Sequence, residues 1–436
     1  MSTSHRLSIF AWALWDAGTA SFNAVMTTFV FTVYLTSEAF GDPDATSLVL
    51  SLGMAAAAAV IVVTAPVVGQ RSDLAGSRRR PLLLNTIGVV VCVATCFLVR
   101  PEPGYLYLGV ALIAVANVFA ELATVQYNSL LPVISTPQTV GRVGGLGWSM
   151  GYFGGIVALG MVLVFFISPG ILGVPEEGAL NIRMVALFSA GWMAVLSLPI
   201  LLRFPRREAE QLSVSLGQRG TVAESYRRLG RTLRRLWRDE PVAFRFFLAS
   251  AVFRDGLAGI FTFGGILAAG SFGFSFNQVI LFAIVGNIIA GTGAVLGGRL
   301  DDAVGPQRVI VASLIGLLVA ATPLLFLQER WLFWICGLFL CAFVGPAQSA
   351  SRSYLSRLVV PGTEGEYFGL YSTTGRAMSF LAPAAFAATV WVFGAQIWGI
   401  IGLMAILALG LVLALRLPNI TGAPARETAP QPQDVR

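Results

Sequence analysis

The sequence predicts an all-α polytopic membrane protein, with twelve transmembrane helices in two pseudo-symmetric six-helix bundles. Three observations support this fold class. The chain of 436 residues is 56% hydrophobic and only 12% charged, whereas a soluble domain has about 25% charged residues. Its apolar residues form long continuous runs, and a helix needs about 20 such residues to cross a bilayer. A polar motif between two of these runs recurs at the corresponding place in the second half of the chain.

Twelve apolar runs define the expected spans. We place them at residues 8–36, 47–69, 81–99, 105–130, 142–167, 183–202, 244–269, 276–297, 308–327, 331–355, 367–393 and 396–416. The connections after even-numbered spans hold most of the arginines, and those after odd-numbered spans hold only Arg100, Arg183 and Arg330. Positive charge stays on the cytoplasmic side. We therefore expect an integral protein of a bacterial-type plasma membrane with both termini in the cytoplasm.

A polar connection divides the chain into two halves. Residues 1–202 form the first six-helix bundle, 203–243 a basic cytoplasmic linker, 244–416 the second bundle, and 417–436 a Pro-rich tail that we expect to be disordered. Within the linker, helical spacing places apolar residues on one face and arginines opposite, the apolar set being Tyr226, Leu229, Leu233 and Leu236/Trp237. This pattern predicts an amphipathic helix on the inner membrane surface. The net charge of +7 then favours anionic membrane lipids, and not nucleic acid, as a partner.

The recurring motif joins the second and third spans of each half. It reads "GQRSDLAGSRRR" at 69–80 and "GGRLDDAVGPQR" at 297–308, and a shift of 229 residues superposes the two copies. The shift pairs Gly69 with Gly298, Asp73 with Asp302 and Gly76 with Gly305, and it leaves Arg78 and Arg308 one residue out of step. Such a repeat indicates internal duplication, as in transporters built from two related halves.

We interpret this motif as a gating latch. Glycine lets two helices approach closely, and an aspartate at a helix end meets a neighbouring helix N-terminus or an arginine. The arginines, including Arg79 and the span-10 residue Arg352, bind lipid headgroups or fasten one half to the other. Such contacts exist only while the halves are closed on the inner side, so they bias a rocking motion. A solvated turn with positive-inside charge is the alternative.

The first copy resembles the signature of the major facilitator superfamily, G-x-x-x-D-x-x-G-x-R-R, with Gly69, Asp73, Gly76, Arg78 and Arg79 at its fixed positions. Other segments resemble the vacuole-effluxer (autophagy-related amino-acid effluxer) family: "WALWDAGTASFNAVMTTFVFTVYL", "GRVGGLGWSMGYFGG", "VFRDG" and "AQSASRSYLSRLVVPGTEGEYFGLYSTTGR". The resemblance implies the major facilitator fold, a central cavity lined mainly by spans 1, 4, 7 and 10, and alternating access. It also implies solutes related to amino acids.

Six ionisable residues lie inside expected spans: Asp16, Glu121, Arg254, Asp255, Arg352 and Arg376. An ionised group in hydrocarbon costs several kcal/mol, so each must face a cavity or a partner. Two interpretations stay open. In the structural one, the six form inter-helix salt bridges that hold the inner gate shut. In the functional one, Asp16 and Glu121 couple transport to a proton, and Arg254 holds a carboxylate of the solute through bidentate contact.

Uncharged polar residues inside the spans complete a candidate solute site. They are Asn23, Gln126, Asn128, Asn287 and Gln348. Each of these side chains is able to hydrogen-bond a solute, and each is equally able to satisfy a neighbouring helix.

Several function classes are excluded by residue usage. All 29 basic residues are arginine, so the chain lacks the lysine of a phosphate-binding loop or of a pyridoxal Schiff base. His5 is the only histidine, and the four cysteines lie in apolar runs, so we expect no metal site, no cofactor and no enzymatic activity. The leading hypothesis is a monomeric, proton-coupled secondary transporter of small organic solutes, with amino-acid-like solutes favoured. The alternatives are an exporter of lipophilic drugs or metabolites, and a receptor or scaffold that does not transport.

Overall fold

The computed structural model describes residues 3–75, 77–167, 170–202 and 222–421, and every regular element in these ranges is helical. The predicted latch residue Gly76 lies outside the described residues, as do linker residues 203–221 and tail residues 422–436. The described parts nevertheless contain both halves of the chain and the other predicted site residues.

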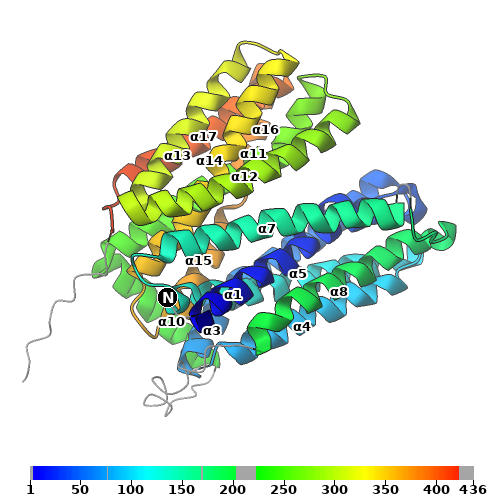
Figure 1. The fold of residues 1–436 in the computed structure, drawn as a ribbon. Coiled ribbons are helices and arrows are strands. Elements are labelled where there is room, and N and C mark those ends of the chain that lie inside the picture. Colours follow the sequence, from blue (N-terminus) through cyan, green and yellow to red (C-terminus); the bar gives the residue numbers. More distant parts are fainter. Residues whose placement is uncertain (1–2, 76, 168–169, 203–221, 422–436) are drawn as a thin grey trace, which may run out of the picture.

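The first half is a bundle of helices from the region before the linker. Its elements are α1 (Thr3–Ser21), the π-helical η1 (Phe22–Phe29), α2 (Phe31–Leu35), η2 (Glu38–Phe40), α3 (Pro43–Leu74), α4 (Arg79–Thr95), η3 (Cys96–Leu98), η4 (Pro103–Tyr105), α5 (Leu106–Ser129), α6 (Leu131–Ile134), α7 (Val140–Val162), η5 (Leu163–Ile167), η6 (Glu177–Ala179) and α8 (Leu180–Leu202). Figure 1 shows these helices side by side in the lower bundle.

The second half repeats this arrangement after the linker helix α10 (Val222–Arg238). Its elements are α11 (Pro241–Gly270), α12 (Phe276–Val304), α13 (Pro306–Ala321), η8 (Thr322–Leu325), α14 (Arg330–Leu358), α15 (Glu364–Met378), α16 (Leu381–Phe393), η9 (Gln396–Trp398) and α17 (Gly399–Leu415). Eleven helical segments of the described chain are long and apolar enough to cross a membrane. The remaining expected span, 8–36, consists of α1, η1 and α2 in succession. The twelve-helix prediction is therefore consistent with the structure.

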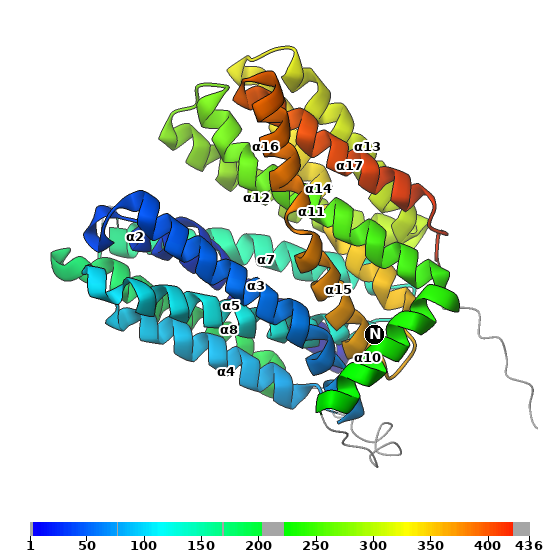
Figure 2. The same ribbon diagram turned by 180° about the vertical axis from the view of Figure 1, so that it is seen from behind.

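The two bundles are joined mainly through two helix pairs, α3 with α15 and α7 with α12. They lie together at one end of the molecule and diverge toward the other end (Figures 1 and 2). We call the joined end the closed end; it carries the connections at residues 75 and 77–78, 135–139, 305 and 359–363. The sequence predicts that this end faces the cytoplasm.

A large apolar cluster explains why the bundles stay together there. It contains buried residues of the first half, among them Ile61 and Val125, packed with residues of the second half such as Phe246, Tyr367 and Tyr371. Between membrane-spanning helices such contacts stabilise through close van der Waals packing, because lipid tails are as apolar as the side chains. Side chains on the outer faces are also apolar, including the exposed Leu52 on α3, as contact with lipid requires.

The expected span 367–393 is present within Glu364–Phe393, but it is not one continuous helix. It breaks between Met378 and Leu381, so that α15 and α16 are separate helices. Pro383 is the third residue of α16, a position that needs no N–H donor to the preceding turn. The carboxylate of Asp255, on α11, accepts a hydrogen bond of 2.6 Å from the backbone N–H of Ala382. The break thus has a charged cap from a neighbouring helix.

The predicted amphipathic linker helix is present as α10, although its faces differ from the prediction. Leu236 is buried in the large apolar cluster, and Leu229 packs against it. Tyr226, Leu233 and Trp237 instead remain exposed on the outer surface of the protein. The predicted single apolar face is therefore divided between the protein and its surroundings.

Candidate functional site

The first copy of the motif ends α3 and contacts the first turn of α15. The buried Asp73 carboxylate accepts backbone hydrogen bonds from Gly365 N (3.0 Å) and Glu366 N (2.9 Å). Both N–H groups belong to the four at a helix start that have no partner within the helix, and the negative charge also complements the helix dipole. One turn earlier, a Cβ on Gly69 would lie only 1.9 Å from the Gly365 carbonyl oxygen. Only glycine allows this approach.

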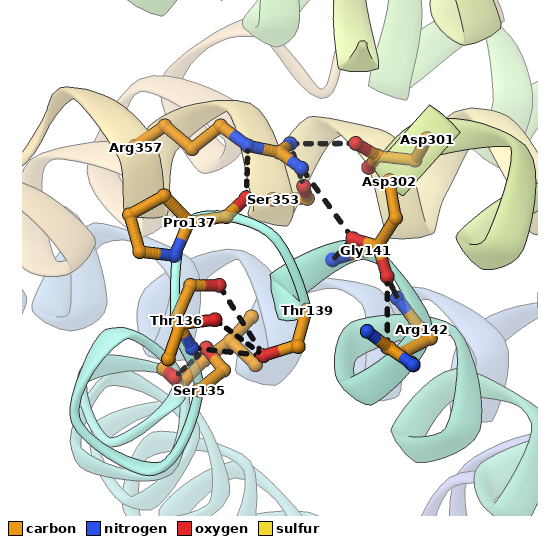
Figure 3. A network of polar contacts seen from close by, with 11 residues as sticks. Ser135, Thr136, Pro137, Thr139, Gly141, Arg142, Asp301, Asp302, Ser353 and Arg357 are labelled. Atoms are coloured by element: carbon orange, nitrogen blue, oxygen red, sulfur yellow. Dashed lines mark hydrogen bonds and ion pairs between the residues drawn. The ribbon is translucent and has the colours of Figure 1, made fainter. Parts of the chain in front are cut away.

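The second copy makes the corresponding contact between α12 and α7. Asp302 accepts from Gly141 N (2.8 Å) and Arg142 N (3.2 Å), as Figure 3 shows. A Cβ on Gly298 would lie 2.4 Å from the Gly141 carbonyl oxygen. The shift of 229 residues therefore pairs residues that make equivalent contacts, because each copy of the motif caps a helix of the opposite half.

A further turn of each helix continues the pattern. Ala65, four residues before Gly69, lies against Gly369, and Ala294, four residues before Gly298, lies against Gly145. In both pairs a Cβ on the glycine would come within 2.7 Å of the facing alanine carbonyl oxygen. The latch is thus a strip of small residues that ends in an aspartate cap, present once in each half.

Buried arginines reinforce both caps. Arg78 contacts Asp73 (3.1 Å) and Glu364 (2.6 Å) through Nη2, which links the two halves. Beside the second cap, Arg357 contacts Asp301 (2.6 Å) and Asp302 (3.5 Å). A buried charge that loses its partner is costly, so these ion pairs favour closure of this end.

Two predicted latch arginines take no part in this network. Arg79 and Arg308 are exposed, and neither has an ion pair among the described residues. Gly305 has φ of 93° and ends α12, and the Asn419 side chain fills the space beside it. The solvated-turn alternative therefore describes Arg79 and Arg308, whereas Gly305 is buried and the aspartates contact the opposite half.

A second polar cluster lies deeper in the molecule, around Asp16 of α1. The Tyr127 hydroxyl donates to Asp16 Oδ2 (3.3 Å), and Arg352 Nη1 of the other half lies 3.7 Å from the same oxygen. Arg352 also donates to Asn128 Oδ1 (2.9 Å) and to the Gly144 carbonyl (3.1 Å). Arg352 is thus buried and bound across the interface, and it does not extend toward lipid headgroups. Its contact with Asp16 is long, and the Asp16 side chain keeps 21% of its surface exposed.

A second acid–base pair also joins the halves. Arg376 of α15 forms an ion pair with Glu121 of α5, and the Ser372 hydroxyl donates to the same carboxylate (3.0 Å). The Glu121 side chain is 23% exposed. Both predicted coupling acids therefore have a partner arginine in the opposite half, and both are partly accessible.

Arg254 has a different environment from the other charges within the spans. Its guanidinium lies 3.8 Å from the centre of the Tyr371 ring and donates to the Tyr371 carbonyl (3.1 Å). Among the described residues it has no carboxylate within ion-pair distance. The neighbouring Asp255 caps α16 instead. The two successive residues thus act separately, as their angular offset on a helix predicts.

The uncharged candidates divide into two groups. Asn128 holds Arg352, and Gln348 accepts from the Tyr152 hydroxyl (3.1 Å), so both belong to the central polar region. The others are occupied elsewhere: Gln126 is buried and accepts from Ser72 (2.7 Å), Asn287 donates to its own helix at Ala283, and Asn23 is exposed on the π-helical segment.

Sequence reasoning missed several members of the latch. Arg357, Asp301 and Glu364 were not assigned to it, although they carry its ion pairs. A signal was present, because the doublet "DD" at 301–302 and the acids of "TEGE" at 363–366 stand at span ends. Each of these residues pairs with a residue that is tens to hundreds of positions away in the sequence. Composition and local spacing do not reveal such a pairing.

Comparison with solved structures identifies the fold. A double tryptophan mutant of the proton:xylose symporter XylE matches with a TM-score of 0.72, 13% identity and coverage of 96% of both chains. The transporter FucP in the outward conformation matches with a TM-score of 0.69 and 14% identity over 95% of this chain and 98% of that one. These matches show that the chain has the fold of the major facilitator superfamily.

The particular family follows from the sequence comparisons. The family model described as vacuole effluxer Atg22 like matches residues 32–425, and the chain belongs to this family. An uncharacterized MFS-type transporter, YxiO of Bacillus subtilis, is 22% identical over 419 residues, covering 94% of this chain and 95% of that protein. Autophagy-related protein 22 of Kluyveromyces lactis is 25% identical over 353 residues, covering 74% and 69%. Membership of this family supports the expected membrane transporter.

Proposed function

We propose that the protein moves an amino-acid-like solute by alternating access and that transport is coupled to protons. The observation that carries this proposal is the pair of acid–base contacts between the halves, Asp16 with Arg352 and Glu121 with Arg376. When the closed end opens, the halves separate and each carboxylate loses its arginine. A carboxylate without a countercharge in a low-dielectric surrounding takes up a proton more readily. Opening is thereby linked to protonation.

Pseudo-symmetry supports a solute with both charges. The offset that relates Gly141 to Gly365 also relates Gly151 to Gly375. A Cβ on Gly151 would lie 3.5 Å from the Asp16 carboxyl carbon, and one on Gly375 would lie 3.0 Å from Arg254 Nη1. An acid and a base therefore occupy equivalent places in the facing halves. A zwitterion such as an amino acid carries the complementary pair of charges, with its carboxylate at Arg254.

A transport assay tests the proposed substrate class. Protein in liposomes is given a panel of amino acids, sugars and amphiphilic cations without ATP, with and without an imposed pH difference. We expect accumulation of one or more amino acids only when the pH difference is present. Accumulation of amphiphilic cations alone would favour the lipophilic exporter, and no movement of any solute would favour a receptor or scaffold.

Variants at Arg254 test its role. Arg254→Gln should raise the KM for a transported amino acid about tenfold or more, because a charge-assisted hydrogen bond contributes about 1.5–3 kcal/mol. Arg254→Lys keeps the charge but loses the bidentate geometry, so its KM should lie between that of the wild type and that of Arg254→Gln. An unchanged KM in both variants would remove Arg254 from the solute site.

Variants at the acids test the coupling. Glu121→Gln should abolish accumulation driven by the pH difference while leaving exchange of internal for external solute. Asp16→Asn should abolish this accumulation as well, and it should also slow exchange, because Asp16 is the acid proposed to face the ammonium group of the solute. Full accumulation in both variants would show that neither acid carries the proton.

We further propose, from the distribution of arginines, that the closed end faces the cytoplasm, and cysteine labelling of intact cells tests this orientation.

A further inference from the structure

The linker helix α10 has an outer surface with two distinct ridges. One is apolar and exposed: Tyr226 (40% exposed), Leu233 (47%) and Trp237 (66%). Next to it around the helix is a ridge of four exposed arginines at 3- and 4-residue spacing, Arg227, Arg231, Arg234 and Arg238. Residues three and four apart share a helical face, so the four charges act as one basic strip.

These four arginines differ from the other two of the helix. Arg228 pairs with Glu224 (2.8 Å) and Arg235 with Glu240 (3.2 Å). The basic strip, in contrast, has no acidic partner among the residues that the structure describes. Its charge is available to an external anionic group.

The surroundings of α10 indicate which anionic group this is. The Tyr226 hydroxyl donates to the Val63 carbonyl of α3 (3.2 Å), and the Val63 and Val60 side chains are exposed and apolar on a membrane-spanning helix. The apolar ridge of α10 is therefore continuous with a lipid-facing surface. A helix that combines exposed aromatic residues with a neighbouring arginine strip has the composition of an interfacial helix. Anionic phospholipid headgroups fit both features.

The position of α10 connects this surface to the latch. Its first half contacts α3 of one bundle, and its end leads through Glu240 to α11 of the other (Figure 2). Glu240 also accepts a hydrogen bond from Tyr367 of α15, the residue that follows the capped Glu366. The helix thus lies across the closed end and touches both bundles, so its attachment to a surface restrains their separation.

We propose that the outer face of α10 binds anionic phospholipids of the adjacent leaflet and that this binding stabilises the closed end. The lipid then regulates the conformational equilibrium independently of the solute. An arginine near an anionic membrane surface contributes enough for about a fivefold change in affinity. Loss of four such charges should therefore weaken the effect of the lipid at least tenfold.

The test uses the full chain in nanodiscs of phosphatidylcholine with increasing phosphatidylglycerol. Spin labels replace Leu172 and Phe326, which are exposed at the opposite end in different halves, in a cysteine-free background. Pulsed electron resonance then measures the populations of their separations. Molecules whose closed end is intact should show the long separation between these two labels. For the wild type we expect the population with this long separation to rise with the content of phosphatidylglycerol. No solute is required, so failure here is distinct from failure of the transport proposal.

Two matched variants complete the test. The first replaces the basic strip by glutamine (R227Q, R231Q, R234Q, R238Q) and should need at least ten times more phosphatidylglycerol for the same population. The second replaces four exposed arginines elsewhere, Arg71, Arg80, Arg299 and Arg416, and should respond like the wild type. An unresponsive wild type, an unaltered response of the first variant, or equal losses in both variants would overturn the proposal. Thermal unfolding in detergent verifies that both variants fold.

Discussion

Replacement of Asp73 by asparagine should open the closed end. The carboxylate accepts hydrogen bonds from Gly365 N and Glu366 N, at 3.0 and 2.9 Å, and an ion-pair contact from Arg78 at 3.1 Å. Asparagine keeps one oxygen but turns an N–H group toward a backbone N–H. Other latch contacts remain, so the protein should still fold.

The size of the effect follows from these contacts. One hydrogen bond to a charged group contributes about 1.5–3 kcal/mol, and a negative charge at a helix N-terminus about 0.3–1 kcal/mol. The closed arrangement should therefore lose about 3 kcal/mol relative to the open one, which is roughly a hundredfold change in the equilibrium constant. Asp302→Asn should act similarly, because Asp302 makes the same two contacts with the first turn of α7.

The assay measures the separation of spin labels at Arg80 and Arg299, exposed residues of the two halves near the closed end. Asp42→Asn is the matched control. Asp42 caps α3 at its other end by accepting from Ala45 N (3.0 Å), and asparagine is an equally good N-cap. Its distance distribution should equal that of the wild type. If the Asp73 variant also gave the wild-type distribution, the cap would not hold the halves together.

Two further predictions concern the packing of the helices. Gly69→Ala should shift the same equilibrium toward the open state, because the new Cβ would lie 1.9 Å from the Gly365 carbonyl oxygen. Gly160→Ala is the control, because a Cβ at Gly160 would have no atom within 4 Å. Equal label distances in the two variants would contradict this prediction. Asp255→Ala should lower the melting temperature in detergent, since loss of an N-cap costs about 1 kcal/mol. Asp255→Asn should keep the wild-type melting temperature, because asparagine still accepts a hydrogen bond from Ala382 N. Equal melting temperatures of the two variants would exclude a capping role.

Much of the architecture could be predicted because its signals are local. Continuous apolar runs define the spans, and the four-residue spacing of Gly69 and Asp73 recurs at Gly298 and Asp302. The break in span 11 also has a local signal, Pro383, which our prediction did not consider. Each of these features depends on residues within a few turns of one another.

The partners of the predicted site residues could not be inferred in the same way. Asp73 meets Gly365 and Glu366, nearly three hundred residues later in the chain. Which of several arginines a carboxylate meets depends on how the bundles pack, and Arg79 and Arg308 were therefore assigned to the latch while Arg357 was not. The N–H groups at a helix start belong to the backbone, so no residue type in the sequence marks them as the partners of an aspartate.

We expect the two bundles to rock about a shared region, so that one end closes as the other opens. Two label pairs test it directly, Arg80 with Arg299 at the closed end and Leu172 with Phe326 at the opposite end. Asp73→Asn should lengthen the first separation and shorten the second in the same sample. Separations that change independently, or that both increase, would contradict a rocking mechanism.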